Sequence, residues 1–458
     1  MSSDKVTLMI GVSGVRGIVG ETLTPELVTR LGVAFGTYMN SGKIIVGRDT
    51  RVSGEMIKHS VLAGLISTGC EVVDLGIVTT PTCSLMVREL KAAGAVIITG
   101  SHNPIEWNAL KFLKSNGIFL NDEEGKQLLN IYYQGAFKKM GWAGLHTVTE
   151  DNTAADRHIK KVLANIKVGL IQEQKFKVVL DSCNGAGAII TPLFLKELGC
   201  EVIPIHCEPN GLFPHNPEPI FINLQELCRT VKKEKADIGF AQDPDADRVA
   251  IVDANGHYLG EEYSVSLAAN YILKKNRGGA IAVNVVTSMV IDDIAKKHHA
   301  RLIRTKVGEV HVAEAMIAEM AVIGGEGNGG VMWPKVHPVR DSLVGIALTL
   351  QNMAENRKSI KQLAEELPVY HIVKEKIDCP MKDSHKVMDL VKGYYRKEKI
   401  VTTDGLMIDK NGARITVRPS NTEPIFRIFV ESDSHSKSLK MALDIKKTIA
   451  GMLKKINH

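Results

Sequence analysis

The stretch KIIVG (43–47), followed by GEMIKHSVLAGLIST (54–68) and EVVDL (71–75), decides the fold class of this chain. The first and last segments are short, mostly apolar runs of the kind that buried strands show. The middle segment places Ile57, Val61 and Leu65 at helical spacing. A strand, a helix and a strand at this length predict a β-α-β unit.

The same order of segments recurs twice further along the chain. We predict a strand at 177–180, a helix running to 198 and a strand at 202–205, then a strand at 280–286, a helix over 291–297 and a strand at 302–304. The sequences GCEVV (69–73) and GCEVI (199–203) stand at the same helix-to-strand junction of two units. Gly69 and Gly199 lie where a helix C-cap favours a left-handed residue. These similarities indicate an internal repeat of α/β units.

The pattern changes near residue 370. Two strands are predicted at 414–417 and 425–430, and a Lys-rich helix follows to the C-terminus. We therefore expect an α/β fold with three similar α/β domains that have mixed sheets, plus a C-terminal α+β domain. The expected boundaries are 1–150, 151–255, 256–368 and 369–458.

Composition excludes several classes of protein. A hydrophobic content of 44% and a charged content of 24% are typical of a globular protein and exclude a disordered or fibrous chain. The 57 Lys and Arg against 51 Asp and Glu give a net charge of +6 on 458 residues, too dilute for a dedicated nucleic-acid-binding protein. The Lys-rich tail keeps nucleic-acid binding as an alternative, but its apolar residues recur at helical spacing and indicate a helix with one solvated face: Leu439, Ala442, Ile445, Ile449 and Leu453.

The sequence also bears on location and partners. No apolar run is long enough for a signal peptide or a membrane span. The seven cysteines are odd in number and contain no C-x-x-C pair, which favours reduced thiols over a disulfide framework or a zinc site. We expect a cytoplasmic protein with no membrane and no nucleic-acid partner. The sequence carries no signal of the oligomeric state.

The candidate functional residues lie in loops that follow predicted strands, where α/β proteins place their catalytic and binding residues. The sharpest is Asp243-Pro244-Asp245-Ala246-Asp247-Arg248, called the metal loop here. Three carboxylates at alternate positions repel one another unless a cation compensates them, and oxygen ligands suit Mg²⁺. An EF-hand is excluded, because Arg248 and Ala254 stand where it needs Gly and Glu. The structural alternative is a solvated acidic turn.

Further loops carry candidate phosphate-binding or nucleophilic residues. The segment 418–424, with Arg427 nearby, offers donors for a phosphate or is an ordinary polar turn. The glycines of segment 11–17 with Arg16 allow a phosphate to approach, although no Walker Lys-Ser/Thr follows. Ser101 follows a predicted strand at 95–99 and is either a nucleophile or the cap of a following helix, which its position alone favours. His102 is expected to point away from Ser101, so a hydrolase triad is disfavoured.

In this order the loops resemble the signatures of the α-D-phosphohexomutase family, and the resemblance runs over essentially the whole chain. A serine loop T-x-S-H-N-P stands at Thr99–Pro104, the metal loop D-x-D-x-D-R at Asp243–Arg248, a sugar loop G-E-x-x-G at Gly325–Gly329 and a phosphate loop R-x-S-N-T-E-P at Arg418–Pro424. The resemblance implies four domains around a central cleft. It further implies transfer of a phosphoryl group between O6 and O1 of a hexose phosphate, with a hexose 1,6-bisphosphate as intermediate and activator.

The resemblance also implies a role for each matching residue, and it reverses the preference for Ser101 as a cap. Ser101 would be phosphorylated in the resting enzyme, and a phosphoserine oxygen would join Asp243, Asp245 and Asp247 around Mg²⁺. The residues implied to surround the reacting phosphoryl group are Arg16, Lys111 and Arg248. Those implied to hold the sugar and its distant phosphate are Glu326, Asn328, Arg418, Ser420, Asn421, Thr422 and Arg427.

Departures from the family pattern bear on the choice of hexose. Several relatives end the sugar loop in S-G-H, whereas this chain has Asn328-Gly329-Gly330. Mannose and glucose branches place a Lys and a His where Val285 and Glu309 align, and RTKVGE (304–309) is similar to the T-K-V-G-D stretch of phosphoglucosamine mutases. We therefore expect glucosamine 6-phosphate and glucosamine 1-phosphate as the substrate pair. A phosphomannomutase/phosphoglucomutase is the alternative enzyme, and a phosphosugar-binding relative is the alternative without catalysis.

Overall fold

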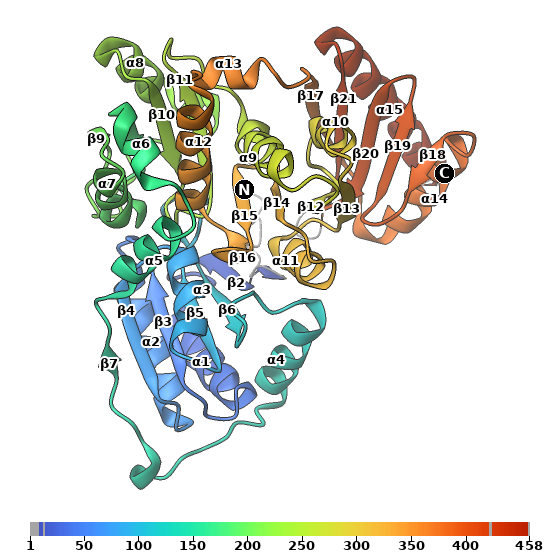
Figure 1. Ribbon diagram of the computed structural model, residues 1–458. Coiled ribbons are helices and arrows are strands. Elements are labelled where there is room, and N and C mark those ends of the chain that lie inside the picture. The colour runs from blue at the N-terminus through green and yellow to red at the C-terminus, as the bar shows by residue number, and fades with distance from the viewer. Residues whose placement is uncertain (1–8, 12–13, 421–423, 457–458) are drawn as a thin grey trace.

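A computed structural model describes residues 9–11, 14–420 and 424–456. The chain forms four consecutive units, each with its own sheet, which Figure 1 shows in blue, green, yellow to orange, and red. The expected fold class is confirmed, because three units combine parallel and antiparallel pairs with flanking helices and the last has an antiparallel sheet.

The first unit contains the stretch that defined the fold class, which forms β3, α2 and β4. Its sheet has the order β1-β2-β6-β5-β3-β4-β7, with β3 parallel to β4 and β5, and β6 antiparallel to β5 and β2. One face packs under α1 and α2 and the other under α3. The elements are β1 (Met9–Gly11), β2 (Gly14–Ile18), α1 (Pro25–Tyr38), β3 (Ile44–Arg48), α2 (Gly54–Ser67), β4 (Val72–Ile77), α3 (Thr80–Glu89), β5 (Gly94–Ile98), β6 (Trp107–Lys114), α4 (Asp122–Gln134), η1 (Trp142–Gly144) and β7 (Thr149–Glu150).

The second unit repeats this arrangement on a smaller sheet of order β11-β10-β8-β9. Gly69 and Gly199 have φ of 82° and 72°, so both junction glycines are left-handed as predicted. The elements are α5 (Ala154–Leu163), α6 (Val168–Gln174), β8 (Lys177–Asp181), α7 (Gly187–Glu197), β9 (Glu201–Ile205), η2 (Phe221–Asn223), α8 (Gln225–Glu234), β10 (Ile238–Gln242) and β11 (Val249–Asp253).

The third unit has the order β13-β12-β14-β15-β16 and shares one continuous apolar core with the second. In this shared core, residues of β8 and β10 pack with residues of α9 and α12. The sequence did not predict that the two units share a core. The elements are α9 (Glu261–Lys275), β12 (Ala280–Asn284), α10 (Val290–Lys297), β13 (Arg301–Thr305), α11 (Glu309–Ala318), β14 (Ile323–Glu326), β15 (Gly330–Trp333), β16 (His337–Arg340), α12 (Ser342–Asn356) and α13 (Ile360–Ala364).

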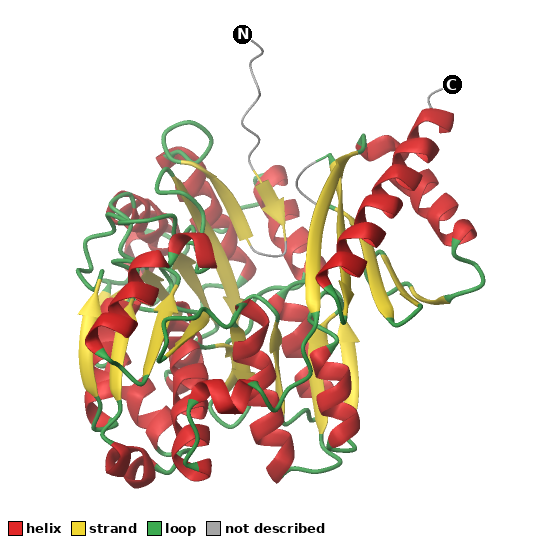
Figure 2. Ribbon diagram, turned by 90° about the horizontal axis from the view of Figure 1, so that it is seen from above, coloured by secondary structure: helices red, strands yellow, loops and turns green. Residues whose placement is uncertain are grey.

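The fourth unit is a five-stranded sheet of order β17-β21-β20-β19-β18, with two helices packed against it (Figure 2). Ala442, Ile445 and Ile449 of α15 are buried against the sheet, as their spacing predicted, but Leu439 is 38% exposed because it lies outside that narrow stripe. The elements are β17 (His371–Asp378), η3 (Met381–Asp383), α14 (Ser384–Tyr394), β18 (Lys399–Val401), β19 (Leu406–Lys410), β20 (Ala413–Pro419), β21 (Ile425–Ser432) and α15 (His435–Ile456).

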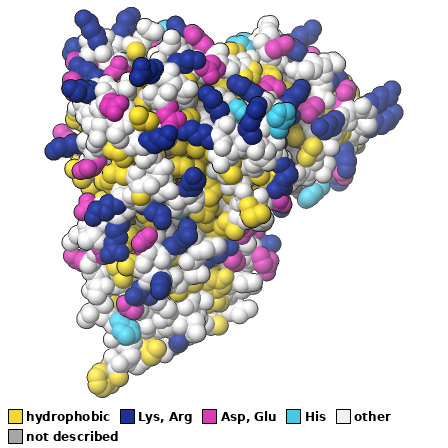
Figure 3. All heavy atoms as spheres, in the orientation of Figure 1, with side chains coloured by type: hydrophobic (Ala, Val, Ile, Leu, Met, Phe, Trp, Pro, Cys, Tyr) yellow, Lys and Arg dark blue, Asp and Glu magenta, His cyan; other side chains and the backbone are white. Residues whose placement is uncertain are grey.

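Three further findings bear on the sequence-based expectations. No helix in the described part of the chain is both long and apolar enough to cross a membrane. All seven cysteines lie within the described residues, and none of them forms a disulfide. On the face shown in Figure 3, basic and acidic side chains occur side by side.

Candidate active site

One cleft of about 620 Å³ brings together side chains from all four units. Serine-loop, metal-loop and sugar-loop residues line it, together with Arg427 of β21. The residues on its wall that the sequence singled out are Arg16, Ser101, His102, Lys111, Arg248, Glu309, Glu326, Asn328 and Arg427. The cleft therefore unites loops that lie far apart in the sequence.

Ser101 lies just beyond β5, in a left-handed conformation with φ of 49°. Its backbone N–H donates to Thr99 Oγ1 at 2.8 Å, and its hydroxyl donates to Asp243 Oδ2 at 3.1 Å. A side-chain-bearing residue keeps such a conformation only where its surroundings hold it, often at functional sites. The next element is the strand β6, so the interpretation of Ser101 as a helix cap is wrong.

His102 does not point away from Ser101, contrary to expectation. Its Nδ1 lies 3.3 Å from Ser101 Oγ, because the left-handed backbone at Ser101 departs from the strand geometry that separates neighbouring side chains. The charge of Arg248, together with burial and the charge of Arg16, holds the pKa of His102 well below its usual value. The ring is therefore neutral and poorly suited to act as a base, so a hydrolase triad stays disfavoured.

Arg51, which sequence reasoning missed, holds the serine loop. Its guanidinium is completely buried between Asp49, whose Oδ2 lies 3.2 Å from Nε, and the backbone of the loop. It donates at 2.6 to 3.0 Å to four carbonyl oxygens, those of Ser101, Asn103, Pro104 and Trp107. The available signal was a charged pair, Asp49 and Arg51, directly after a buried strand.

Asp243, Asp245 and Asp247 are buried, and an oxygen of each lies within 4.8 Å of the others. The metal loop is therefore not the solvated acidic turn that was the alternative. Burial and the charges of the other two aspartates raise the pKa of Asp243 well above its usual value. Oδ1 of Asp245 and Oδ1 of Asp247 are buried without a hydrogen-bond partner. Buried orphan acceptors are rare, and such a set of oxygens fits a divalent cation.

Lys111 supplies part of the counter-charge from β6. Its Nζ lies 2.8 Å from Asp245 Oδ2, the oxygen that also accepts from the Thr80 hydroxyl at 2.7 Å. Burial raises the pKa of Asp245, but the charge and hydrogen bond of Lys111 outweigh it and hold that pKa far below its usual value. Asp245 is therefore ionised at neutral pH.

Arg16 and Arg248 add positive charge beside the serine loop. Arg16 Nη1 donates to Asn103 Oδ1 at 2.8 Å. Arg248 Nε lies 3.8 Å from Asp243 and 3.7 Å from Asp247, and it is buried without a hydrogen-bond partner. Guanidinium donors placed in this way suit the acceptor oxygens of a phosphoryl group.

Arg340, at the end of β16, joins the metal loop to the sugar loop and was not predicted. Its Nη2 lies 2.6 Å from Asp247, its Nη1 2.9 Å from Glu326 and its Nε 3.0 Å from Glu309. Burial lowers the pKa of Arg340, but the three carboxylates raise it well above its usual value. Burial also raises the pKa of Glu309 to about 7. A permanently charged side chain therefore links the two loops.

Glu326 is the fixed acceptor of the sugar loop. Its Oε1 accepts from Asn284 Nδ2 at 2.8 Å and from the Gly308 N–H at 3.2 Å, while Oε2 faces Arg340. Burial raises the pKa of Glu326, but Arg340 and Asn284 outweigh it and lower that pKa. Glu326 is therefore an ionised carboxylate in a single orientation on the cleft wall.

The structure accounts for the glycine at position 330, where the sugar loop departs from the family pattern. A Cβ added to Gly330 would lie 2.2 Å from Arg340 Cδ, so Arg340 fills the space that a side chain at position 330 would need. Asn328 lines the cleft, and its Oδ1 is buried without a hydrogen-bond partner. Asn328 is thus placed to accept from a bound molecule.

The phosphate loop is only partly brought to the cleft by the described residues. Arg427 lines it, whereas Arg418, its cross-strand partner on β20, does not and lies 3.2 Å from Asp404. Ser420 is buried and does not line the cleft. Asn421 and Thr422 lie outside the described residues.

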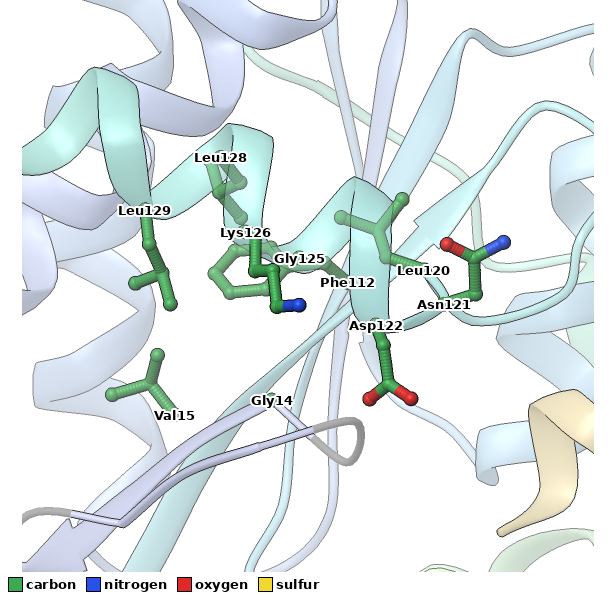
Figure 4. A pocket seen from close by; sticks show the side chains of 10 residues that line it. All are labelled: Gly14, Val15, Phe112, Leu120, Asn121, Asp122, Gly125, Lys126, Leu128 and Leu129. Carbon is green, nitrogen blue, oxygen red and sulfur yellow. The ribbon is translucent and has the colours of Figure 1, made fainter. Parts of the chain in front are cut away.

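A second, smaller pocket of about 170 Å³ lies between β2 and α4 (Figure 4). Its wall includes Gly14, Val15, Phe112, Leu128 and Leu129, and none of the side chains predicted to take part in the reaction. We therefore place the active site at the cleft that all four units line.

Comparison with known proteins identifies the class. The chain matches, in order, four families described as phosphoglucomutase/phosphomannomutase alpha/beta/alpha domains I, II and III and C-terminal domain, over residues 7–139, 156–256, 261–370 and 373–448. The chain belongs to the phosphoglucomutase/phosphomannomutase family and is an enzyme of the phosphohexomutase class.

Individual relatives carry more than one name. A protein of Methanopyrus kandleri named "Probable phosphoglucosamine mutase" is 39% identical over 94% of this chain and 95% of its own length. A "Phosphoglucomutase/phosphomannomutase" of Thermococcus kodakarensis is 38% identical over 94% of this chain and 96% of its own. The crystal structure of a phosphoglucomutase/phosphomannomutase family protein from Burkholderia thailandensis has a TM-score of 0.83 at 24% identity, covering 96% of this chain and 98% of the other, which supports the fold.

Proposed function

We propose that this enzyme interconverts hexose 6-phosphate and hexose 1-phosphate through a phosphoserine at Ser101 and a hexose 1,6-bisphosphate, with glucosamine phosphates as substrates. One observation carries the proposal. The Ser101 hydroxyl, 3.1 Å from Asp243, shares a four-unit cleft with the sugar-loop residue Glu326 and with Arg427.

The groups around Ser101 have separate roles in the transfer of the phosphoryl group. In the first half-reaction the bond between phosphorus and Ser101 Oγ breaks, a bond to the free sugar hydroxyl forms, and the proton of that hydroxyl ends on Oγ. Arg16 and Arg248 hold the phosphoryl oxygens as charge moves between the two oxygens. Lys111 lies on the same wall and assists the proton transfer.

The metal loop supports Mg²⁺ as the cation of this site. Asp243, Asp245 and Asp247, with one phosphoserine oxygen, would hold it, since the buried Oδ1 atoms of Asp245 and Asp247 have no hydrogen-bond partner. When bound, Mg²⁺ neutralises charge on the phosphoryl group. Hexose 1,6-bisphosphate acts as the activator, because it rephosphorylates Ser101 when the intermediate escapes.

The bisphosphate must then turn over, so that its other phosphate returns to Ser101. Glu326 and Asn328 hold the sugar in both orientations. The phosphate that is not reacting is bound by Arg427 together with Arg418, Ser420, Asn421 and Thr422. Arg418 must leave Asp404 to take part, since the two lie 3.2 Å apart. Such a change would accompany closure of the fourth domain, whose proposed boundary is residue 369.

Glu262 supports the amino sugar. Its carboxylate lies against the sugar loop, because a Cβ on Gly327 would meet Glu262 oxygens at 2.1 and 2.2 Å, and Glu262 lines the cleft. Burial raises the pKa of this carboxyl group to about 8, but the ammonium group of glucosamine would favour its ionised form and pair with it. The alternative, a phosphomannomutase/phosphoglucomutase, is favoured by the name of the Thermococcus kodakarensis relative.

Two measurements test the proposal. Turnover of glucosamine 6-phosphate with Mg²⁺ and catalytic hexose bisphosphate, beside glucose and mannose phosphates, gives kcat/KM for each. Turnover of none of them would refute the mutase, and a preference for a neutral hexose would refute only the substrate.

Intact-mass measurement on protein from its native host distinguishes the mutase from a phosphosugar-binding relative. One phosphate per chain should be present, absent in Ser101→Ala and retained in Ser115→Ala, a control at an exposed serine. Protein without phosphate at Ser101 would favour the binding protein. The cytoplasm remains our proposed location, on the evidence of the unpaired thiols.

A further inference from the structure

A second group of potential metal ligands lies in the second unit, outside the active site. Asp181 ends β8, His206 follows β9, and His215 lies in the segment that leads to η2. Nδ1 of His206 and Nε2 of His215 each lie 3.1 Å from the same oxygen, Oδ2 of Asp181. None of these residues has a role in the proposed mutase reaction.

In each of the three residues, the side-chain atom that faces away from the other two already has a partner. Oδ1 of Asp181 accepts the N–H of Cys183 at 2.9 Å. Nδ1 of His215 lies 2.8 Å from the Asn216 carbonyl oxygen, and Nε2 of His206 lies 3.5 Å from Glu226 Oε2. A carbonyl oxygen can only accept, so the His215 proton is on Nδ1 and its Nε2 lone pair is left for another partner. Metal-bound histidines are oriented by outer partners of this kind.

The inner atoms therefore allow two states. Either each ring carries a proton on its inner nitrogen and donates to the shared carboxylate oxygen, or both inner nitrogens are unprotonated and a cation lies between the three atoms.

Distance and access both accommodate an ion. With bonds of about 2.0–2.2 Å, ligand atoms at tetrahedral or octahedral angles lie about 2.9–3.5 Å apart, and the two nitrogen–oxygen distances here are 3.1 Å. The side chains of His206 and His215 are 18% and 16% exposed, so that water can complete the coordination. A similar group, His158, His337 and Asp341, is at most 1% exposed and lacks this access.

We propose that Asp181, His206 and His215 form a binding site for a divalent transition metal, Zn²⁺ above all, that is distinct from the magnesium site. Two imidazoles and one carboxylate are a ligand set that Zn²⁺ uses, whereas Mg²⁺ prefers oxygen ligands.

The site would stabilise the serine loop indirectly, through Arg51. The segment after His206 packs on the first unit, where the ring of Phe213 lies 4.8 Å from the Arg51 guanidinium carbon, and Arg51 holds the serine loop. Gly211 lies so close to Thr50 that an added Cβ would be 2.1 Å from its carbonyl oxygen. A metal at the base of this segment would tie the second unit to the residue that supports Ser101.

The test is a calorimetric titration of the full-length protein with Zn²⁺ in saturating Mg²⁺, which keeps the metal loop filled. One Zn²⁺ per chain should bind, with release of protons from the two rings. His206→Gln and His215→Gln should each weaken binding by at least about tenfold. Two controls should retain it: His257→Gln, which alters a pair between an exposed histidine and the buried Asp253, and Asp245→Asn in the metal loop.

A second readout guards against misfolded variants. Zn²⁺ should raise the Tm of the wild-type protein, because a ligand that binds only the folded state stabilises it, and should not raise that of the two glutamine variants. Absence of Zn²⁺ binding in the wild type, or binding unchanged in both glutamine variants, would overturn the proposal. Since the titration involves no turnover, its failure leaves the proposed mutase reaction untouched.

Discussion

Arg340→Met tests whether one guanidinium holds the metal loop and the sugar loop together. The substitution keeps most of the side-chain volume but removes contacts with Asp247, Glu326 and Glu309 at 2.6, 2.9 and 3.0 Å. Three buried carboxylates then lose their common partner. Breaking a buried ion pair from one side costs about 3–5 kcal/mol of folding stability. Glu309, whose pKa is already about 7, will take up a proton and reduce that cost.

The effect on catalysis should exceed the effect of lost stability alone. Each charge-assisted hydrogen bond contributes about 1.5–3 kcal/mol, and those to Asp247 and Glu326 bear on the reaction. With a factor of ten for each 1.36 kcal/mol, we expect kcat/KM to fall by about 10²–10⁴. The Mg²⁺ concentration for half-maximal activity should rise by about 10- to 100-fold, as when a ligand loses its outer partner.

The assay is steady-state turnover against Mg²⁺ concentration, with Tm measured in parallel. Gly330→Ala should also lower kcat/KM and raise the Mg²⁺ requirement, because its methyl group displaces Arg340 while the charge stays. Arg304→Met is the matched control: it breaks a partly buried pair with Asp292, outside the cleft, and should lower Tm without changing the Mg²⁺ requirement. An Arg340→Met enzyme with wild-type Mg²⁺ requirement and kcat/KM within about threefold would refute the reasoning.

Three further outcomes are expected. Asp245→Asn should lower turnover at least about a hundredfold with an unchanged circular dichroism spectrum, while Asp156→Asn, at an exposed position, should not; a near wild-type rate would contradict the metal assignment. Arg51→Met should lower stability by about 3–5 kcal/mol in urea unfolding, and a loss no larger than that of an exposed ion pair, about 1 kcal/mol, would argue against its hold on the serine loop. Burial raises the pKa of Glu262 to about 8 from 4.5, so its contribution to stability is present below about pH 4.5 and lost as pH rises through 8. Tm should therefore fall more between pH 5 and 9 in the wild type than in Glu262→Gln, and equal falls would contradict this.

Much of the fold was predictable because its signals are local. Strand and helix periods are set by neighbours within a few residues, which is why β3, α2 and β4 were found close to their bounds. The cluster of aspartates in the metal loop could be predicted for a similar reason, since three carboxylates at alternate positions are a local pattern. Where local geometry departs from the regular strand, as at Ser101 with φ of 49°, the prediction for His102 was wrong.

By itself, the sequence determined the order of strands and helices, the four loops and the residue types that could handle a phosphoryl group. Only the tertiary structure decided that Arg51 supports the serine loop, that Arg340 joins Asp247 to Glu326, and that Arg418 pairs with Asp404. These contacts join residues from separate elements, most of them distant in the sequence. Their distances are set by how sheets and domains pack, which no pattern of neighbouring residues encodes.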